Sequence, residues 1–93
     1  MIKIILFYKF VEIKNPEKLR KAHIEFCKNL GLKGKVLLAN EGINGSVAGT
    51  EEQIDQYISE LRKDPRFSDI EFKEEMGIEN PFDKMIVRVR NEI

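Results

Sequence analysis

Residues 37–50, with the sequence LLANEGINGSVAGT, place a turn between two apolar runs and end where a helix should begin. The segment holds three of the six glycines of the chain, together with two asparagines. Glycine and asparagine suit the backbone angles that a tight connection between two strands requires. We therefore expect a β-hairpin with strands at Val36–Ala39 and Ser46–Ala48, and with positive φ angles at Gly42 and Gly45.

Thr50 and Gln53 have the spacing of a capping box, which indicates that a helix begins after this hairpin. The apolar residues that follow recur at helical spacing, namely Ile54, Tyr57, Ile58 and Leu61. Asp64-Pro65 ends this pattern, because proline is poorly tolerated inside a helix. A helix from about Glu51 to Lys63 is therefore expected.

The part of the chain before the hairpin predicts a strand and then a helix. Ile2–Val11 carries apolar residues on both alternating faces, which is typical of a central strand. Asn15-Pro16 supplies a helix start, Gly31 a stop, and Leu32 a residue that folds back on the last turn. The inward positions between them are Leu19, Ala22, His23, Phe26, Cys27 and Leu30.

The remaining residues predict two further strands. Ile70 and Phe72 alternate with charged residues and indicate a fourth strand, and apolar residues alternate again over residues 85–90 as a fifth. Residues 74–83 between them are expected to form the one long loop. The resulting order predicts an α+β, ferredoxin-like βαββαβ sandwich, in which an antiparallel sheet carries two helices on one face and an added C-terminal strand.

The composition describes one domain over residues 1–93. Lysine plus arginine and aspartate plus glutamate each number 16, so the formal net charge is zero. Residues 1–50 carry nine basic and four acidic side chains, and residues 51–93 carry seven and twelve, so the two halves are oppositely charged. This asymmetry predicts either one mixed surface or a basic region that attracts an anionic partner.

Few residues in the sequence are suited to catalysis or metal binding. One cysteine and one histidine exclude an internal disulfide and a cysteine-based zinc site. His23 and Cys27 share one helix face, but their apolar neighbours favour a core pair over a catalytic dyad. We therefore expect no catalytic residue, metal or cofactor. The apolar start of the chain is too short for a membrane span, and a cytoplasmic location is expected.

The hairpin also carries polar side chains that turn geometry alone does not demand. Asn40 and Asn44 tolerate left-handed backbone angles, but Glu41 has no such reason to be there. Exposed amides in such a loop suit an anion or the edge of a nucleobase. We therefore expect a substrate or interdomain surface at Asn40, Glu41, Gly42, Asn44 and Gly45.

Four segments in this order and spacing resemble the N-terminal domain of the bacterial rhodanese-containing tRNA uridine hydroxylases. They are FYKFVEIKNPEKLRKAHIEFCKNLGLKG, KGKVLLANEGINGSVAGT, DPRFSDIEFK and FDKMIVRVRNEI. The resemblance implies an acylphosphatase-like ferredoxin fold that precedes a rhodanese domain. It also implies a whole protein that uses oxygen to install 5-hydroxyuridine at the wobble position of certain tRNAs.

The resemblance leaves two functions open for this chain. The essential cysteine of that family belongs to the rhodanese domain, and Cys27 does not correspond to it. One function is positioning of tRNA, with basic candidates at Lys33, Lys35, Arg66, Arg88 and Arg90. The other is docking onto the C-terminal rhodanese domain, which would complete the pocket of that domain without contacting RNA. In both cases the isolated chain is expected to hydroxylate no RNA.

The resemblance to acylphosphatases does not extend to their phosphate site. Acylphosphatases of similar fold place a phosphate-binding arginine in a glycine-bearing loop after the first strand. Here that stretch reads VEIKNP, over residues 11–16, and contains neither arginine nor glycine. We therefore expect no hydrolysis of acyl phosphates.

Overall fold

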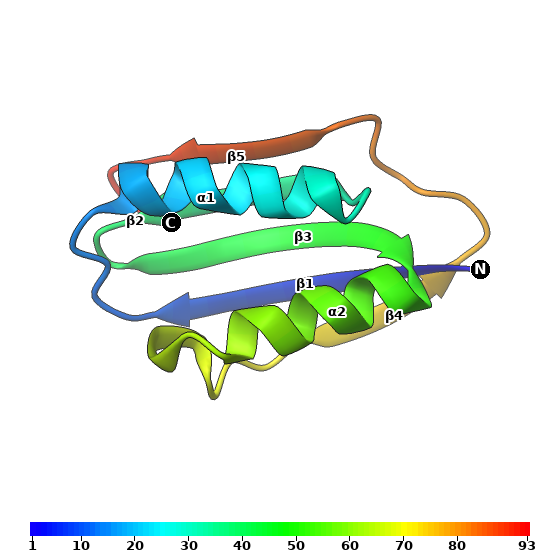
Figure 1. Ribbon diagram of the computed structural model, residues 1–93, viewed down its shortest axis with the longest axis horizontal. Coiled ribbons are helices and arrows are strands. Elements are labelled where there is room, and N and C mark those ends of the chain that lie inside the picture. The colour runs from blue at the N-terminus through cyan, green and yellow to red at the C-terminus, as the bar shows by residue number, and fades with distance from the viewer.

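Both helices lie against the same face of a five-stranded sheet in the computed structural model, which describes residues 1–93 (Figure 1). The elements in chain order are β1 (Ile2–Phe10), α1 (Pro16–Asn29), β2 (Lys33–Ala39), β3 (Gly42–Thr50), α2 (Glu51–Arg62), a short 3₁₀ turn η1 (Pro65–Phe67), β4 (Lys73–Gly77) and β5 (Met85–Val89). The predicted two-layer α+β sandwich is confirmed. Neither helix is long and apolar enough to cross a membrane.

The sheet has the strand order β4-β1-β3-β2-β5. The first four strands are antiparallel neighbours, as the ferredoxin-like arrangement requires. The added strand β5 differs, because it runs parallel to β2, with Gly34 opposite Met85 and Leu38 opposite Val89. The sheet is therefore mixed: the predicted antiparallel sheet comprises its first four strands, and the predicted C-terminal strand is added to it in parallel.

The fourth strand lies later in the chain than the alternation of Ile70 and Phe72 predicted. Strand β4 begins at Lys73, and the residues from Ile70 to Phe72 are outside any strand. Ile70 is buried and Phe72 packs against the core, so their alternation comes from filling the end of the core rather than from a pleated strand. The connection between β4 and β5 is correspondingly shorter than the predicted loop over residues 74–83.

The helix ends follow the predicted capping residues. The Asn15 side chain accepts a hydrogen bond from the backbone N–H of Lys18, and Pro16 opens α1. At the other end the N–H of Leu32 donates to the Cys27 carbonyl across Gly31, which has a φ of 77°. Thr50 and Gln53 form the expected capping box at the start of α2.

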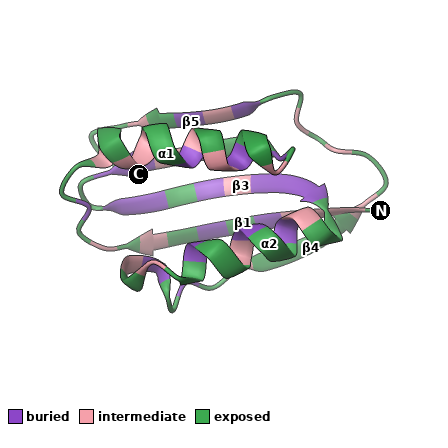
Figure 2. Cartoon of the chain, viewed as in Figure 1, coloured by how far each residue is buried: buried purple, intermediate pink, exposed green.

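The core fills the space between the helices and one face of the sheet, while the outer sides of both helices are exposed (Figure 2). Ile5 and Phe7 of β1 point into it, and the Phe7 ring lies 6.0 Å from that of Tyr57 on α2. The inward positions predicted for α2 are buried or half-buried. On α1 Ala22 is exposed, whereas Ile24, which was not predicted to face inward, packs against the core.

Only one of the two hairpin glycines has the positive φ angle that was predicted for both. Gly42 has the predicted positive φ, at 155°, and a β-carbon there would lie 2.1 Å from the Lys9 carbonyl oxygen. Gly45 does not have a positive φ, so that prediction was wrong. Asn40 and Asn44 also keep negative φ angles, because only glycines adopt positive values in this chain.

Candidate nucleic-acid interface on the sheet

No helix or strand covers the face of the sheet opposite the helices, and we call it the open face, although Ala39 and Ala48 on this face are fully buried. Side chains alternate along a strand, so the neighbours of buried Ile5 and Phe7 on β1 point to this face. Cross-strand pairing then places their partners on the same face. The open face comprises Leu6, Tyr8 and Phe10 of β1, Lys73 and Glu75 of β4, Asn44 and Ser46 of β3, Lys33, Lys35 and Leu37 of β2, and Ile86 and Arg88 of β5.

Large apolar side chains are exposed at the centre of the open face. Tyr8 is 68% exposed, Phe10 65% and Leu6 39%. These residues and their cross-strand neighbours line an open hollow of about 1020 Å³, which Phe82 from the connection after β4 also lines. A patch of exposed aromatic rings on a folded domain usually marks a binding surface.

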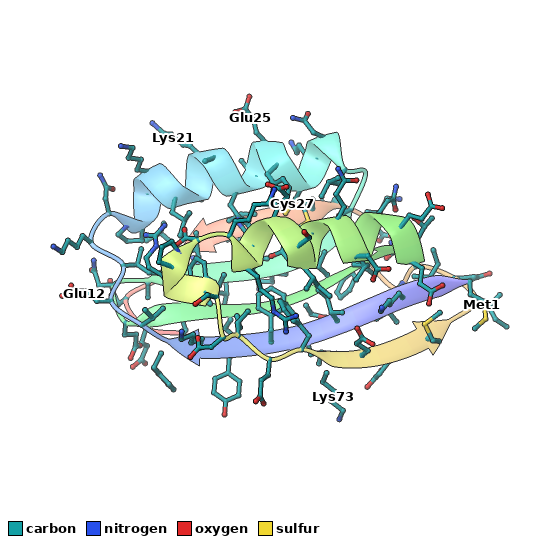
Figure 3. All side chains as sticks on the ribbon, turned by 60° about the horizontal axis from the view of Figure 1, so that its bottom comes forward. Met1, Glu12, Lys21, Glu25, Cys27 and Lys73 are labelled. Atoms are coloured by element: carbon teal, nitrogen blue, oxygen red, sulfur yellow. The ribbon has the colours of Figure 1, made fainter.

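Four cations surround this apolar patch. Lys33, Lys35, Lys73 and Arg88 all belong to the open face, and none of them forms an ion pair. Figure 3 shows Lys73 pointing away from both helices, whereas Lys21 and Glu25 project from the outer side of α1. The only carboxylate among the strand residues of the open face is Glu75. The strand residues of the open face therefore combine aromatic rings with a net positive charge, while Asp69 and Glu71, from the segment before β4, also line the hollow.

The structure separates the predicted hairpin residues into two groups. Asn44 lies in β3 on the open face, directly between Tyr8 and Leu37. Gly42 and Gly45 are buried in the same strand, and Asn40 and Glu41 form the turn at the end of the sheet. Of the five, only Asn44 therefore presents a side chain to the open face.

Asn40 and Glu41 connect the hairpin to the segment after β1. The Asn40 side-chain amide donates to the Ile13 carbonyl at 2.9 Å, and the Ile13 N–H donates back to the Asn40 carbonyl at 2.9 Å. The Glu41 carboxylate accepts the Ile93 N–H at 3.0 Å, while its backbone carbonyl accepts the Val11 N–H at 2.9 Å. These bonds give both residues a structural role that sequence reasoning did not find.

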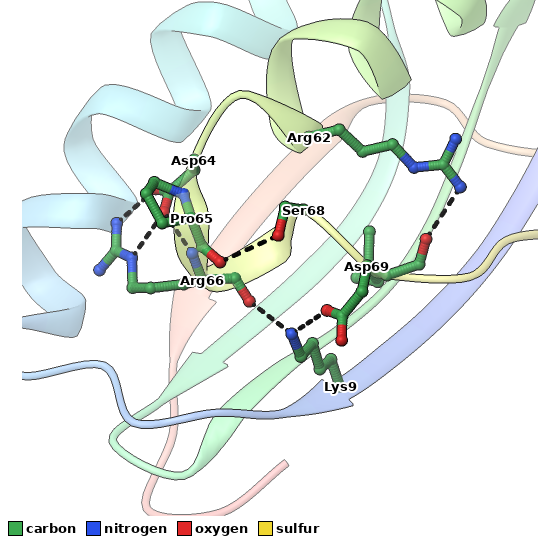
Figure 4. Close-up of polar contacts among 8 residues, drawn as sticks. Lys9, Arg62, Asp64, Pro65, Arg66, Ser68 and Asp69 are labelled. Carbon is green, nitrogen blue, oxygen red and sulfur yellow. Dashed lines mark hydrogen bonds and ion pairs between the residues drawn. The ribbon is translucent and has the colours of Figure 1, made fainter.

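Two of the basic candidates lie apart from the open face. Asp64 holds the Arg66 guanidinium through two hydrogen bonds of 3.0 and 2.7 Å (Figure 4), and this pairing raises the pKa of Arg66 and lowers that of Asp64. Arg66 belongs with η1, where its carbonyl accepts a bond from Lys9. Arg90 lies beyond the end of β5, and its N–H donates to the Leu38 carbonyl.

Sequence reasoning did not identify Tyr8 and Phe10 as exposed residues. The apolar residues on both faces of β1 were interpreted as a sign of a central strand, and which of the two faces is exposed was not predicted. A signal was nevertheless present, because two helices on one face leave the other face of a central strand without cover. A strand with two apolar faces under those conditions must expose one of them.

His23 and Cys27 form part of the core, as expected. The partner of His23 is Tyr57, whose hydroxyl lies 2.8 Å from Nε2, rather than the thiol. Burial lowers the pKa of His23 to about 4 and raises that of Cys27 to about 12. A neutral imidazole and a protonated, buried thiol do not make a nucleophile and base pair.

Comparison with known proteins agrees with this fold. The family model described as the UPF0176 acylphosphatase-like domain matches residues 2–93. The chain belongs to this family. Among curated relatives, the UPF0176 domain is 52% identical over 91 residues to the tRNA uridine(34) hydroxylase of Bacillus licheniformis. It is 48% identical over 91 residues to the protein of the same name from Staphylococcus carnosus.

The UPF0176 domain spans only a part of these relatives. The two alignments cover 98% of this chain but 28% and 29% of the relatives. Among solved structures, the BLUF protein BlrP1 superposes with a TM-score of 0.77 at 20% identity, covering 96% of this chain and 64% of the other. BlsA in its ground state superposes with a TM-score of 0.74 at 21% identity, covering 98% and 66%. At such low identity these structures support the fold alone.

Proposed function

We propose that this chain is the N-terminal domain of a longer tRNA uridine hydroxylase, and that it positions tRNA for the C-terminal rhodanese domain. The names of the curated relatives support the tRNA substrate, and their greater length supports a further domain. The thiol of Cys27 is fully buried in the core and not accessible to a substrate, which supports placing catalysis in the remainder of the protein. A tRNA substrate implies a cytoplasmic location.

The observation that carries the proposal is the cluster of four unpaired cations on the open face. Phosphate groups bind lysine and arginine side chains and release condensed counterions, which gives most of the affinity for nucleic acid. Lys33 and Lys35 belong to β2, Lys73 to β4 and Arg88 to β5, so all four lie on paired strands rather than on a flexible tail. The sheet therefore fixes the spacing of these residues before RNA binds, and ordering the protein backbone costs little conformational entropy on binding.

Docking onto the rhodanese domain is the second candidate function. Leu6, Tyr8 and Phe10 are exposed, and apolar side chains of this kind also form the centre of interfaces between domains. The bond between Glu41 and Ile93 would favour the same role, because it fixes the direction of the C-terminal residues. Docking requires no contribution from the lysines, which separates it from RNA binding.

Removal of two lysines tests the proposal. The Lys33→Ala/Lys35→Ala variant of the chain should bind tRNA more weakly, and the plot of log affinity against log salt should flatten by roughly 0.7–0.9 per lost phosphate contact. Fluorescence anisotropy with labelled tRNA over a range of salt concentrations measures both quantities. Lys21→Ala/Lys28→Ala is the matched control, because it removes two exposed lysines from α1.

The two variants give a clear decision. RNA positioning requires that the slope change in the open-face variant and stay at its wild-type value in the control. An equal loss in both variants would mean that RNA senses only the overall charge. An unchanged slope in both, together with a weakened contact to the rhodanese domain in the full-length protein, would instead establish docking.

A further inference from the structure

Tyr8 and Phe10 contribute little to the stability of the fold. Both lie outside the core cluster, and the only aromatic contact of Tyr8 is with Phe10, at 6.2 Å between ring centroids and 76° between ring planes. The two rings are therefore edge to face, so they present differently oriented surfaces to solvent. Two thirds of each residue is exposed, at 68% and 65%. A role in binding explains this exposure where packing does not.

Polar groups stand next to these rings at fixed positions. Across the sheet Tyr8 is followed by Asn44 on β3, then Leu37 on β2 and Arg88 on β5. Neighbouring strands are about 4.8 Å apart, so an amide lies one strand from the Tyr8 ring and a guanidinium about three strands away. Each polar group is therefore within reach of a ligand that rests on the ring.

The surroundings of Phe10 differ, because its cross-strand partner is Gly42. Glycine has no side chain, so nothing from β3 stands beside the Phe10 ring. Substitution of Gly42 is excluded by its backbone, since a β-carbon would meet the Lys9 carbonyl oxygen. The fold thus keeps a β3 side chain away from Phe10, although the Ile93 side chain lies near Gly42, with Cδ1 3.1 Å from where a β-carbon would be.

This combination fits unpaired nucleobases better than a protein partner or an RNA duplex. Aromatic rings bind the flat face of any base, and nearby cations bind the phosphates that connect successive bases. A duplex hides the faces of its bases in the stack, and so cannot use the rings. A protein partner would use the apolar centre of the patch without requiring the cations that surround it, whereas RNA uses both.

We propose that the open face binds a single-stranded RNA segment, with unpaired bases stacked on Tyr8 and Phe10. The Asn44 side chain donates and accepts hydrogen bonds at the edge of the base stacked on Tyr8. Lys35 and Arg88 bind the backbone phosphates of the same RNA segment. The inference rests on the proposed tRNA-positioning function and specifies it, because it assigns the contact to unpaired nucleotides rather than to the helical stems.

Replacing the rings by leucine tests stacking while keeping the patch apolar. Tyr8→Leu/Phe10→Leu should weaken binding of a short labelled single-stranded RNA by roughly 5- to 150-fold for each stacked base that is lost. The salt dependence should stay at its wild-type value, because every lysine remains. Tyr8→Phe keeps a ring at this position and should bind nearly as well as wild type. Thermal unfolding checks that each variant is folded.

Intrinsic fluorescence gives a second measurement. The chain has no tryptophan and two tyrosines, of which Tyr57 is fully buried. Tyrosine emission should therefore be quenched by single-stranded RNA through Tyr8, and far less by the same strand annealed to its complement. The quenching should disappear in Tyr8→Phe although binding persists.

The outcomes separate stacking from the broader function. Wild-type affinity in the leucine variant, with a flattened salt dependence in Lys33→Ala/Lys35→Ala, would overturn stacking and leave RNA positioning intact. Equal affinity for the single strand and its duplex would also overturn it. Wild-type RNA affinity in the leucine variant, together with a weakened contact to the rhodanese domain in the full-length protein, would make these rings a docking surface.

Discussion

Gly45 has no room for a β-carbon, although its backbone angles suit any residue. A β-carbon there would lie 2.6 Å from the Phe7 ring and 3.1 Å from a methyl group of Val36. Gly45→Ala should therefore lower the free energy of unfolding by about 1–3 kcal/mol, because a packed core accommodates extra volume poorly. Chemical denaturation monitored by circular dichroism measures the difference.

Gly77 provides the matched control at the edge of the sheet. The nearest atom to a β-carbon at Gly77 is the Glu79 carbonyl oxygen at 3.6 Å, an ordinary contact distance. Gly77→Ala should be neutral or stabilise the fold by up to about 1 kcal/mol, since alanine restricts the unfolded chain. Equal destabilisation by both substitutions would contradict the steric explanation for Gly45.

His23 makes the stability of the fold depend on pH. Burial lowers its pKa from 6.5 to about 4, so the unfolded chain binds a proton at a pH where the folded chain does not. The contribution of His23 to the free energy of unfolding is fully present above pH 6.5 and is lost as the pH falls from 6.5 to about 4. The loss should amount to about 3 kcal/mol, from 1.36 kcal/mol per pKa unit.

A non-titrating variant isolates this effect from that of the carboxylates. The glutamine amide in His23→Gln offers Tyr57 a hydrogen-bond partner but takes up no proton in this range. Denaturation curves at a series of pH values should show a shallower fall in stability for His23→Gln than for wild type between pH 6.5 and 4. Parallel curves would show that His23 is not protonated on unfolding.

At the scale of elements, β5 is part of the core rather than an appendage. Val87 and Met85 are buried, and α1 packs over the strand. Val87→Ala should lower the free energy of unfolding by about 1–3 kcal/mol, because the cavity left behind closes only partly. Arg88→Ala, one residue away on the open face, should change it by less than about 0.5 kcal/mol. Similar losses in the two variants would contradict the assignment of faces.

The sequence predicted the elements that are stabilised by interactions between residues close together in the chain. Capping residues fixed both helices, because a side chain that satisfies a backbone N–H acts within one turn. The position of β4 was not predictable in this way. Its residues, KEEMG, are exposed on both sides of an edge strand, and such strands carry charges rather than an apolar alternation. Their place is set by pairing with β1, about seventy residues earlier in the chain.

For a related reason, the sequence identified basic residues of the candidate site but not how the sheet brings them together. Arg88 was identified as a basic residue on an expected strand, and Lys33 and Lys35 as basic residues just before the strand expected at Val36–Ala39, but their convergence depends on β5 joining β2. The parallel pairing that brings Arg88 beside Leu37 is a property of the whole sheet. Arg66, with an equally promising position in the sequence, is instead held by Asp64 two residues away.

At the scale of the whole molecule, the segment after β1 offers a phosphate group neither an arginine nor the N–H groups of Val11 and Ile13. The N–H groups of Val11 and Ile13 already donate to the hairpin turn, and Asn15 caps α1. The purified chain should therefore release no inorganic phosphate from an acyl phosphate above the uncatalysed rate, as a colorimetric phosphate assay would measure. Turnover that disappears when Lys14 or Lys18 is replaced by alanine would contradict this expectation.

The central place of β1 in the sheet also has a consequence for synthesis on the ribosome. The strand is made before the other strands of the sheet, and its partners begin at residues 42 and 73. At about 5–20 residues per second, β1 waits for several seconds with both of its edges unpaired and its aromatic side chains in solvent. The nascent chain is therefore prone to aggregate until β3 emerges, and a chaperone that binds short apolar segments would recognise β1 during that interval.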